Sequence, residues 1–129
     1  MRLILTGGSG FIGTNLITNC LARPDITLLN LDISPPLNPE HTNYWQRADI
    51  MNGEELKTHV ERFKPTAVIH LAARTDCDEN TSIEDYAVNI QGTQNLLDAL
   101  AITESIDTLV VVSTQFVLGP GVQPDFDWH

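Results

Sequence analysis

Four closely spaced glycines near the N-terminus form the part of the sequence best suited to bind phosphate. The segment Thr6–Gly13 reads Thr-Gly-Gly-Ser-Gly-Phe-Ile-Gly, and its last six residues match the pattern G-x-G-x-x-G. Glycine permits a tight turn and lets the backbone come close to a pyrophosphate. A helix that begins at such a turn directs free N–H groups and its positive dipole end toward phosphate oxygens. The pattern indicates a dinucleotide site when a strand precedes it and a helix follows it; otherwise it is an ordinary turn.

An acidic residue at the expected distance supports dinucleotide binding. Asp32 lies nineteen residues after Gly13, at the end of the second expected strand. A carboxylate there accepts hydrogen bonds from the hydroxyls of the adenosine ribose and repels a 2′-phosphate. Because no Lys or Arg occurs between Pro24 and Gln46, we expect the cofactor to be NAD rather than NADP. The alternative is that Asp32 only caps a turn into Ser34.

The elements around these residues alternate between strands and helices, as in a parallel sheet with crossover helices. Apolar runs predict strands at Leu3–Leu5, Ile26–Leu31, Gln46–Ala48, Ala67–Ile69 and Leu109–Val112, the last of them a central strand, with a loop over 33–45. Helical spacing predicts one helix through Ile12, Leu16 and Cys20, a second through Leu56, Val60 and Phe63 after a capping box at Asn52 and Glu55, and a third over Ser82–Thr103. Right-handed crossovers then favour a Rossmann-type, doubly wound α/β fold with strand order 3-2-1-4-5.

The longest expected helix, Ser82–Thr103, has two apolar faces. Its main stripe, the side that a helix usually buries, consists of Ile83, Tyr86, Ile90, Leu97 and Leu100. Val88 and Leu96 lie off this stripe. A second, partly apolar face indicates that another helix or a second subunit covers it, so a homodimer is possible.

Composition narrows the class of protein. The net charge is −10 with only seven Lys and Arg, which argues against nucleic-acid binding. No apolar stretch approaches the roughly 18–20 residues that cross a bilayer, and the N-terminus leads into the glycine turn rather than a signal peptide. We therefore expect a cytoplasmic protein with no membrane contact. Cys20 and Cys77 form no C-x-x-C pair, so neither a metal site nor a redox motif is expected.

Several further motifs, in the correct order, carry a family resemblance. They are Thr6-Gly7-x-x-Gly10-x-x-Gly13, Asp49-Ile50, His70-Leu71-Ala72-Ala73, Asn89-x-x-Gly92-Thr93 and Ser113-Thr114-x-x-Val117-x-Gly119. Across essentially all 129 residues the chain resembles the extended short-chain dehydrogenase/reductases, particularly the NAD-dependent nucleotide-sugar epimerases and dehydratases. Together these motifs are specific, although each alone is not.

The resemblance implies a set of site residues. Cofactor contacts are expected at Gly7, Gly10, Phe11, Ile12, Gly13, Asp32, Asp49, Ile50, Leu71, Ala72, Ala73 and Asn89. Asp49 and Ile50 match the pair that contacts the adenine, Asn89 matches a residue that fixes the active-site loop, and Thr114 takes the catalytic hydroxyl position. Structural alternatives remain for each: Asp49 as a helix-start residue, Asn89 bonded to backbone, and Thr114 as a strand terminus. His70 is interpreted as a satisfied core histidine with no role in proton transfer.

The family's chemistry also needs a Tyr-x-x-x-Lys motif some twenty to thirty residues after the Ser/Thr, where the tyrosine is the general acid and base. The chain ends at His129, and neither Tyr44 nor Tyr86 has a lysine four residues on. We therefore expect residues 1–129 to be an incomplete NAD-binding Rossmann domain without its substrate-binding region, inactive alone. The full-length protein would transfer hydride at a carbon of a nucleotide sugar. The alternatives are an NAD(P)-dependent reductase or dehydrogenase with a non-sugar substrate, such as a steroid, and a non-catalytic dinucleotide-sensing module.

Overall fold

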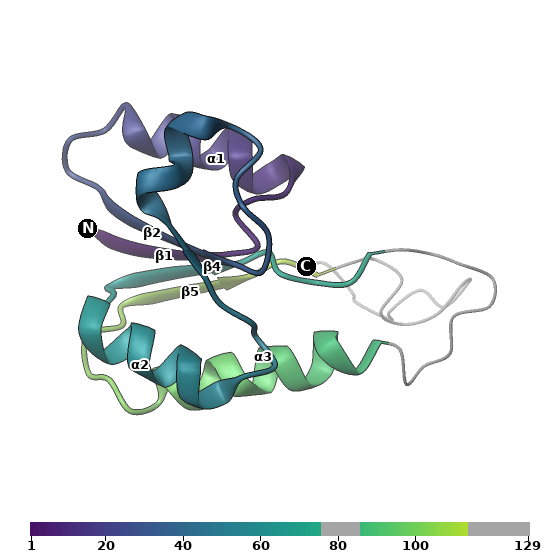
Figure 1. Cartoon of the computed structure of the whole chain (residues 1–129). Helices are drawn as coiled ribbons and strands as arrows, with labels where there is room; N and C mark the ends of the chain where they lie inside the picture. Colours follow the sequence, from purple (N-terminus) through teal and green to yellow (C-terminus); the bar gives the residue numbers. More distant parts are fainter. Residues whose placement is uncertain (76–85, 114–129) are drawn as a thin grey trace, which may run out of the picture.

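Five parallel strands form one sheet in the order β3-β2-β1-β4-β5 (Figure 1). This computed structural model describes residues 1–75 and 86–113. The strands are β1 (Arg2–Thr6), β2 (Thr27–Asp32), β3 (Trp45–Arg47), β4 (Ala67–His70) and β5 (Thr108–Val111). All four neighbouring pairs are parallel, so the predicted Rossmann-type order is confirmed and the observed strand ends differ from the predicted ones by a residue or two. The carboxyl ends of the strands, and the segments that follow them, therefore lie at one edge of the sheet.

Helices cover both faces of the sheet (Figure 1). The helix α1 (Phe11–Leu21) and the short 3₁₀ helix η1 (Pro39–Tyr44) lie on one face, and α2 (Gly53–Phe63) and α3 (Ala87–Leu100) lie on the other. Successive strand side chains point to opposite faces, which divides the core in two. Leu3 and Leu5 pack toward α1, whereas Ile4 and Val68 pack toward α2 and α3. Within the described residues, no helix is long and apolar enough to cross a membrane.

At the start of α2, one of the two hydrogen bonds of the predicted capping box is present. The side chain of Asn52 accepts a hydrogen bond from the backbone N–H of Glu55 at 3.2 Å, as an N-cap residue does. The reciprocal bond of a capping box is replaced, because the Glu55 carboxylate accepts from the backbone N–H of Asp49 at 3.3 Å. The cap therefore links α2 to the segment that leaves β3.

The face of α3 that packs on the sheet was predicted only in part: Leu100 of the predicted main stripe is buried in the core, but other members of the stripe are not. Leu96 is 1% exposed, whereas Ile90 and Leu97 of the predicted main stripe are 71% and 40% exposed. The reason is Gly92, because a Cβ there would lie 2.5 Å from Cδ1 of Ile50. The helix packs closely through small residues that a search for large apolar side chains does not weigh. Ile83 of the predicted stripe lies outside the described residues.

Three other expectations need correction. The helix expected to run to Thr103 ends at Leu100, where Ala101 follows as its C-cap. The expected loop 33–45 contains η1, because the Asn38 side chain accepts from Glu40 N and Pro39 occupies the first helical turn. The strand β5, expected to be central, pairs with β4 alone among the described residues, and Val110 is 45% exposed.

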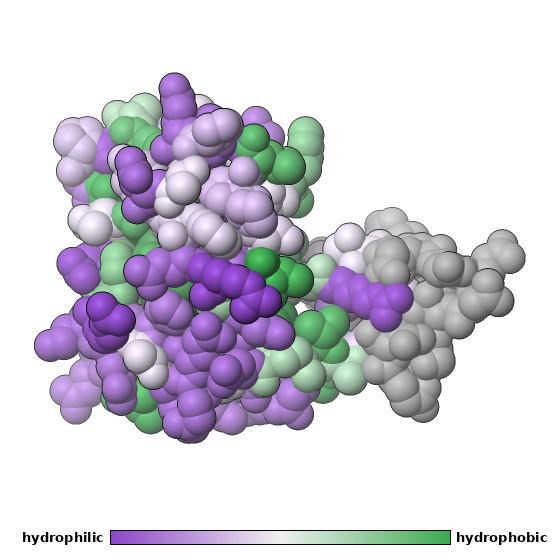
Figure 2. Space-filling model, in the orientation of Figure 1, coloured by the Kyte–Doolittle hydropathy of each residue, from purple (hydrophilic) through white to green (hydrophobic). Residues whose placement is uncertain are grey.

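The surface differs between the body of the molecule and the carboxyl edge of the sheet. Figure 2 shows mostly hydrophilic side chains over the helical layer of α2 and α3, at the lower left. Hydrophobic side chains gather further right, towards the carboxyl ends of the strands. Phe11, Ile12 and Ile33, which lie just beyond strand ends, are 82%, 59% and 58% exposed. Exposed apolar residues at this edge are available to a bound molecule.

Candidate functional site

The glycine turn packs directly against the backbone that leaves β4. Gly7 has a positive φ of 72°, and a Cβ on it would lie 2.5 Å from the backbone nitrogen of Ala72. A Cβ on Gly13 would lie 2.4 Å from Cα of Gly8, so α1 approaches the turn as closely as backbone atoms allow. Gly10 differs, because its nearest neighbour would be the Gly7 carbonyl oxygen at 3.5 Å. Two of the predicted glycines are thus required by close packing.

The N-terminus of α1 opens from this turn without a side-chain cap. Its N-cap residue is Gly10, which has no side chain to accept hydrogen bonds from the first helical N–H groups. Such uncapped N–H groups attract anions, with the helix dipole adding to the effect. Phe11 and Ile12 begin the helix and are exposed. Phe11, Ile12 and Gly13 thus form the uncapped first turn of α1, and a contact between their backbone and a phosphate stays a prediction.

Asn30 of β2 fixes the turn and was missed by the sequence analysis. Its side chain is fully buried, and its Oδ1 accepts a hydrogen bond from Gly8 N at 3.0 Å. Its Nδ2 donates to Oγ of Ser9 at 3.2 Å, and that hydroxyl donates to the carbonyl oxygen of Ser34 at 2.8 Å. A signal was present, because Asn30 is a polar residue inside an apolar strand and lies two residues before Asp32. Residues two apart in a strand point to the same face.

Asp32 contacts both the glycine turn and the segment after β2. One carboxylate oxygen accepts from Ser9 N at 3.0 Å and the other accepts from Ser34 N at 2.9 Å. The turn-capping alternative is therefore present for this half-buried side chain, and a contact between Asp32 and a ribose stays a prediction. Each carboxylate oxygen has two lone pairs, so the bonds to Ser9 and Ser34 leave acceptor capacity for ribose hydroxyls.

A chain of hydrogen bonds joins the ends of β1 and β4 to α3. His70 is 3% exposed; its Nδ1 lies 2.6 Å from Oγ1 of Thr6 and its Nε2 lies 3.1 Å from Oγ1 of Thr93. The Thr93 hydroxyl donates to the carbonyl oxygen of Asn89 at 2.7 Å, so it accepts from Nε2–H of His70. This assigns the proton of the neutral ring to Nε2 and leaves Nδ1 to accept from Thr6. Burial lowers the pKa of His70, and both ring nitrogens have partners, as expected for a core histidine.

Asn89 extends this chain to the segment that follows β4. Its Oδ1 accepts from Arg74 N at 2.7 Å, and its Nδ2 donates to the Arg74 carbonyl oxygen at 3.0 Å. The predicted backbone pairing of Asn89 is therefore present. The same segment is held at its other end by the bond from Leu71 N to the Thr6 carbonyl oxygen at 2.9 Å. Leu71, Ala72 and Ala73 thus lie between two fixed points along the glycine turn.

Asp49 and Ile50 occupy the segment between β3 and α2. Asp49 is half-buried, and its carboxylate accepts from Met51 N at 2.9 Å within a turn that precedes α2. The helix itself is capped by Asn52, so Asp49 is not its start residue. The Ile50 side chain is 7% exposed and packs against Gly92 in the core. Asn95 donates from Nδ2 to the carbonyl oxygens of Ile50 and Met51 at 3.0 and 3.1 Å. The segment is fixed, and a contact between it and an adenine stays a prediction.

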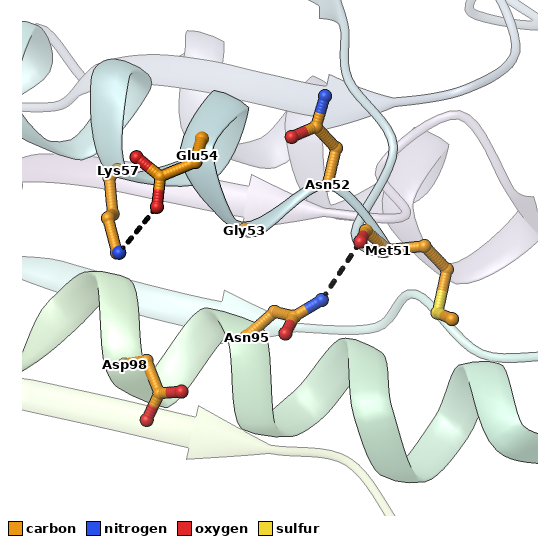
Figure 3. Close-up of a pocket in the computed structure, with 7 residues that line it drawn as sticks. All are labelled: Met51, Asn52, Gly53, Glu54, Lys57, Asn95 and Asp98. Carbon is orange, nitrogen blue, oxygen red and sulfur yellow. Dashed lines mark hydrogen bonds and ion pairs between the residues drawn. The ribbon is translucent and has the colours of Figure 1, made fainter.

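A hollow of about 380 Å³ lies between α2 and α3, away from the glycine turn (Figure 3). It is lined by Met51, Asn52, Gly53, Glu54, Lys57, Asn95 and Asp98. The Lys57 ammonium pairs with Glu54 at 2.7 Å, which raises the pKa of Lys57. No residue of the glycine turn lines the hollow, and the Lys57–Glu54 pair leaves Asp98 as a further acidic group in its lining. Among residues 1–75 and 86–113, no group of three or more His, Cys, Asp and Glu is placed to hold a metal ion.

The residues brought together at the carboxyl edge fit a dinucleotide. They comprise a turn too tight for side chains at Gly7, uncapped N–H groups at α1, and a carboxylate at Asp32 that faces the turn. A family model described as the NAD dependent epimerase/dehydratase family matches residues 3–128. The chain belongs to this family. Thr114, the predicted catalytic residue of this epimerase/dehydratase chain, lies outside the described residues.

Individual relatives within and around this family are diverse. The GDP-6-deoxy-D-talose 4-dehydrogenase of Aggregatibacter actinomycetemcomitans is 32% identical over 100 residues, which cover 78% of this chain and 30% of that protein. A 3-beta-hydroxysteroid dehydrogenase of Mycolicibacterium neoaurum is 36% identical over 104 residues, which cover 76% of this chain and 28% of that protein. The crystal structure of the Thermus thermophilus UDP-glucose 4-epimerase complex with NAD superposes with a TM-score of 0.67 at 31% identity, covering 78% of this chain and 33% of that one. The chain thus spans about a third of the length of these three proteins.

Proposed function

We propose that this chain binds NAD across the carboxyl edge of its sheet, and that the full-length protein is an NAD-dependent epimerase or dehydratase of nucleotide sugars. The observation that carries the proposal is the glycine turn itself. Gly7 lies in contact with Ala72, and the adjacent Ser9 N–H is bound by Asp32. A turn, a strand-end carboxylate and an uncapped helix at one edge are the parts that a dinucleotide requires. The family match and the NAD-bound neighbour at 31% identity support it.

Each part of the edge has a proposed task. The N–H groups of Phe11, Ile12 and Gly13 bind pyrophosphate oxygens, with Gly10 giving them room. Asp32 accepts from the ribose hydroxyls, and Asp49 and Ile50 border the adenine. Bound NAD supplies the acceptor for a hydride from a sugar carbon.

The residues on the β4 side of the edge position the cofactor and do not take part in the reaction. The backbone of Leu71, Ala72 and Ala73 lies along the cofactor, and Asn89 holds this segment through the backbone of Arg74. Thr114 would donate a hydrogen bond to the oxygen on which charge develops. His70 takes no proton, because both of its nitrogens are already bonded inside the core.

The binding half of the proposal is tested by calorimetry of the full-length protein with NAD. The Asp32→Ala variant is expected to bind NAD about ten- to a hundredfold more weakly, because hydrogen bonds to a charged group contribute about 1.5–3 kcal/mol. Asp25→Ala is the matched control, because Asp25 is an exposed carboxylate in a surface pair with Arg23. It should leave the dissociation constant unchanged. Absence of any heat with NAD for the wild-type protein would contradict the proposal.

The catalytic half is tested by supplying the full-length protein with NAD and a panel of nucleotide sugars. Product analysis by mass spectrometry and NMR should show an epimer or a dehydrated keto-sugar. A second candidate is a steroid dehydrogenase, which the 36% identity to the Mycolicibacterium enzyme favours. A 3-beta-hydroxysteroid is therefore included in the panel. Turnover of the steroid alone would replace the sugar proposal.

We also propose that two copies associate through the exposed face of α3. Ile90 is 71% exposed and Leu97 is 40% exposed on a helix whose other face is buried. Sedimentation of the full-length protein should show a dimer that Ile90→Glu dissociates, because a charge there cannot be desolvated in an apolar contact. A monomer at all concentrations would contradict this assembly.

A further inference from the structure

We propose that Asn95 of α3 is a positioning residue for the adenine end of NAD, and that it acts through the segment 49–51 that follows β3. The inference rests on the proposed function, in which Asp49 and Ile50 border the adenine. It adds to that function a residue that none of the sequence motifs contains.

The side-chain amide of Asn95 binds two consecutive backbone carbonyls of this segment, and Figure 3 shows the bond to Met51. Its Nδ2 donates to the carbonyl oxygen of Ile50 at 3.0 Å and to that of Met51 at 3.1 Å. A carbonyl oxygen can only accept, so the nitrogen of the amide must face the segment. The Oδ1 of Asn95 accepts from Nε2 of Gln91, about one helical turn earlier, at 2.9 Å. The amide thus has partners on its nitrogen and on its oxygen, which fixes one orientation.

These two bonds also set where the N–H groups of the segment point. In a planar trans peptide the C=O and N–H bonds point in opposite directions. Because the Ile50 carbonyl is directed at α3, the N–H of Met51 points away from that helix, and it donates to Oδ1 of Asp49 at 2.9 Å. The next peptide repeats the arrangement, since Asn52 N donates to the Asp49 carbonyl oxygen at 2.9 Å. Asn95 therefore determines, through one peptide plane, where the Asp49 carboxylate is held.

Packing brings the segment close enough to α3 for this contact. Ile50 is 7% exposed, and a Cβ on Gly92 would lie 2.5 Å from its Cδ1. Gly92 and Asn95 are three residues apart and so lie on the same side of the helix. At the start of α2, a Cβ on Gly53 would lie 3.6 Å from Cγ of Asn95. The segment is thus packed on α3 through Ile50 and oriented by Asn95.

Asp49 lies at the edge of the sheet that carries the glycine turn. The preceding residue, Ala48, donates from its backbone N–H to the Asp32 carbonyl oxygen at 3.2 Å, so the segment leaves the sheet beside the end of β2. Dinucleotides bind in folds of this type outside the carboxyl ends of the strands. Since Met51 N occupies Oδ1 of Asp49, we assign Oδ2 to the exocyclic amino group, which adenine has and hypoxanthine lacks.

Calorimetry of the full-length protein with NAD and with nicotinamide hypoxanthine dinucleotide tests the inference. Wild type should bind NAD at least about tenfold more tightly than the analogue, which cannot donate to the carboxylate. Asn95→Ala should weaken NAD about tenfold, because Asp49 must then be ordered when the cofactor binds. The same variant should reduce the preference for NAD over the analogue to about threefold or less.

Two other substitutions in α3 calibrate this result. Asn95→Gln, which keeps the amide on a longer stem, should recover part of the NAD affinity and part of the preference. Gln94→Ala is the matched control, because Gln94 is an exposed amide of the same helix that bonds to Asp98 at 2.8 Å. It should change neither dissociation constant.

A double-mutant cycle shows whether Asn95 acts through Asp49. In Asp49→Ala, adding Asn95→Ala should weaken NAD by less than about threefold, because the group that Asn95 positions is already absent. A purely structural role would instead lower the free energy of unfolding, measured with urea, and leave the preference for NAD at its wild-type value. A check without any substitution is amide hydrogen exchange of Met51 N–H in wild type, which NAD should slow more than the analogue does.

The outcomes separate this inference from the proposed function. An unchanged preference in Asn95→Ala would overturn the inference and leave NAD binding in place. Equal affinity of wild type for the two dinucleotides, or equal slowing of Met51 exchange, would also overturn it. Binding of neither dinucleotide would overturn both. Loss of the preference in Asn95→Ala, without a further loss of NAD affinity in the Asp49→Ala background, supports Asn95 as a positioning residue.

Discussion

At the β1–β2 end of the candidate site, the side chains of Asn30 and Asp32 bind N–H groups of the glycine turn directly. At the β4–α3 end, the His70 ring contacts the Thr93 hydroxyl, which donates to the backbone carbonyl oxygen of Asn89. The Asn89 side chain in turn binds the backbone of Arg74 in the segment after β4. Both ends use buried or half-buried polar groups that are hydrogen-bonded to their neighbours. The first end has no histidine and packs backbone against backbone, whereas the second contains a titratable ring. The two ends should therefore respond differently to added bulk and to acid.

The largest effect is expected from bulk at the glycine turn. Gly7→Ala places a Cβ 2.5 Å from Ala72 N on a residue with φ of 72°. The left-handed conformation costs about 1–2 kcal/mol and overpacking about 1–3 kcal/mol, so we expect a loss of about 3 kcal/mol in the free energy of unfolding. Urea unfolding of the full-length protein measures it.

Gly10→Ala is the control for that substitution. Its added Cβ meets nothing closer than the Gly7 carbonyl oxygen at 3.5 Å, and its φ is −76°. Replacing an N-cap glycine by alanine should cost less than about 1 kcal/mol. Equal losses for the two variants would show that the turn does not depend on contact with Ala72.

A smaller effect is expected from removing the side chain that holds the turn from β2. Asn30→Ala leaves Gly8 N without its buried acceptor, which costs about 2 kcal/mol. Asn43→Ala, at an exposed asparagine of η1, should stay within about 0.5 kcal/mol of wild type. Amide hydrogen exchange provides a local check, because Gly8 should exchange faster in Asn30→Ala alone. Unchanged exchange at Gly8 would contradict the role given to Asn30.

The two ends of the site also differ in how far the sequence predicted them. The glycines and Asp32 could be proposed from sequence because their spacing relative to the expected strands and helix is the spacing of a dinucleotide site. Asn30 was missed because its partners, Gly8 and Ser9, are brought to it only by the pairing of β1 with β2.

The strand order was predictable because it follows from chain order and crossover handedness. The buried face of α3 was not, because it depends on which helix side can approach Ile50. The small residues Gly92 and Ala99 let one side of the helix pack closely, whereas a search for hydrophobic periodicity looks for large apolar side chains. Contacts between two elements therefore cannot be predicted from the residue pattern of one element alone.

The smallest effect is the one that acid should produce at the β4–α3 end. Burial lowers the pKa of His70 below its ordinary value of 6.5, so the folded protein keeps the ring neutral at pH values where the unfolded chain binds a proton. The unfolded state then holds more protons, and the free energy of unfolding falls as the pH drops below about 6.5. One proton changes it by at most about 1.4 kcal/mol per pH unit. Above pH 6.5 both states have a neutral ring, and this contribution is constant.

His59 must be separated from His70, because burial also lowers the pKa of His59 in α2. Urea unfolding of the full-length protein between pH 7.5 and 5.0 is therefore compared for wild type, His70→Gln and His59→Gln. We expect the free energy of unfolding to fall less steeply with decreasing pH in His70→Gln than in His59→Gln. The reason is that His70 is 3% exposed and the Thr6 hydroxyl already donates to its Nδ1. Protonation of that nitrogen would oppose two donors until Thr6 rotates. If the free energy of unfolding of His70→Gln fell with pH as steeply as that of wild type, the ring would accept its proton without cost. The two ends of the site would then differ in packing alone.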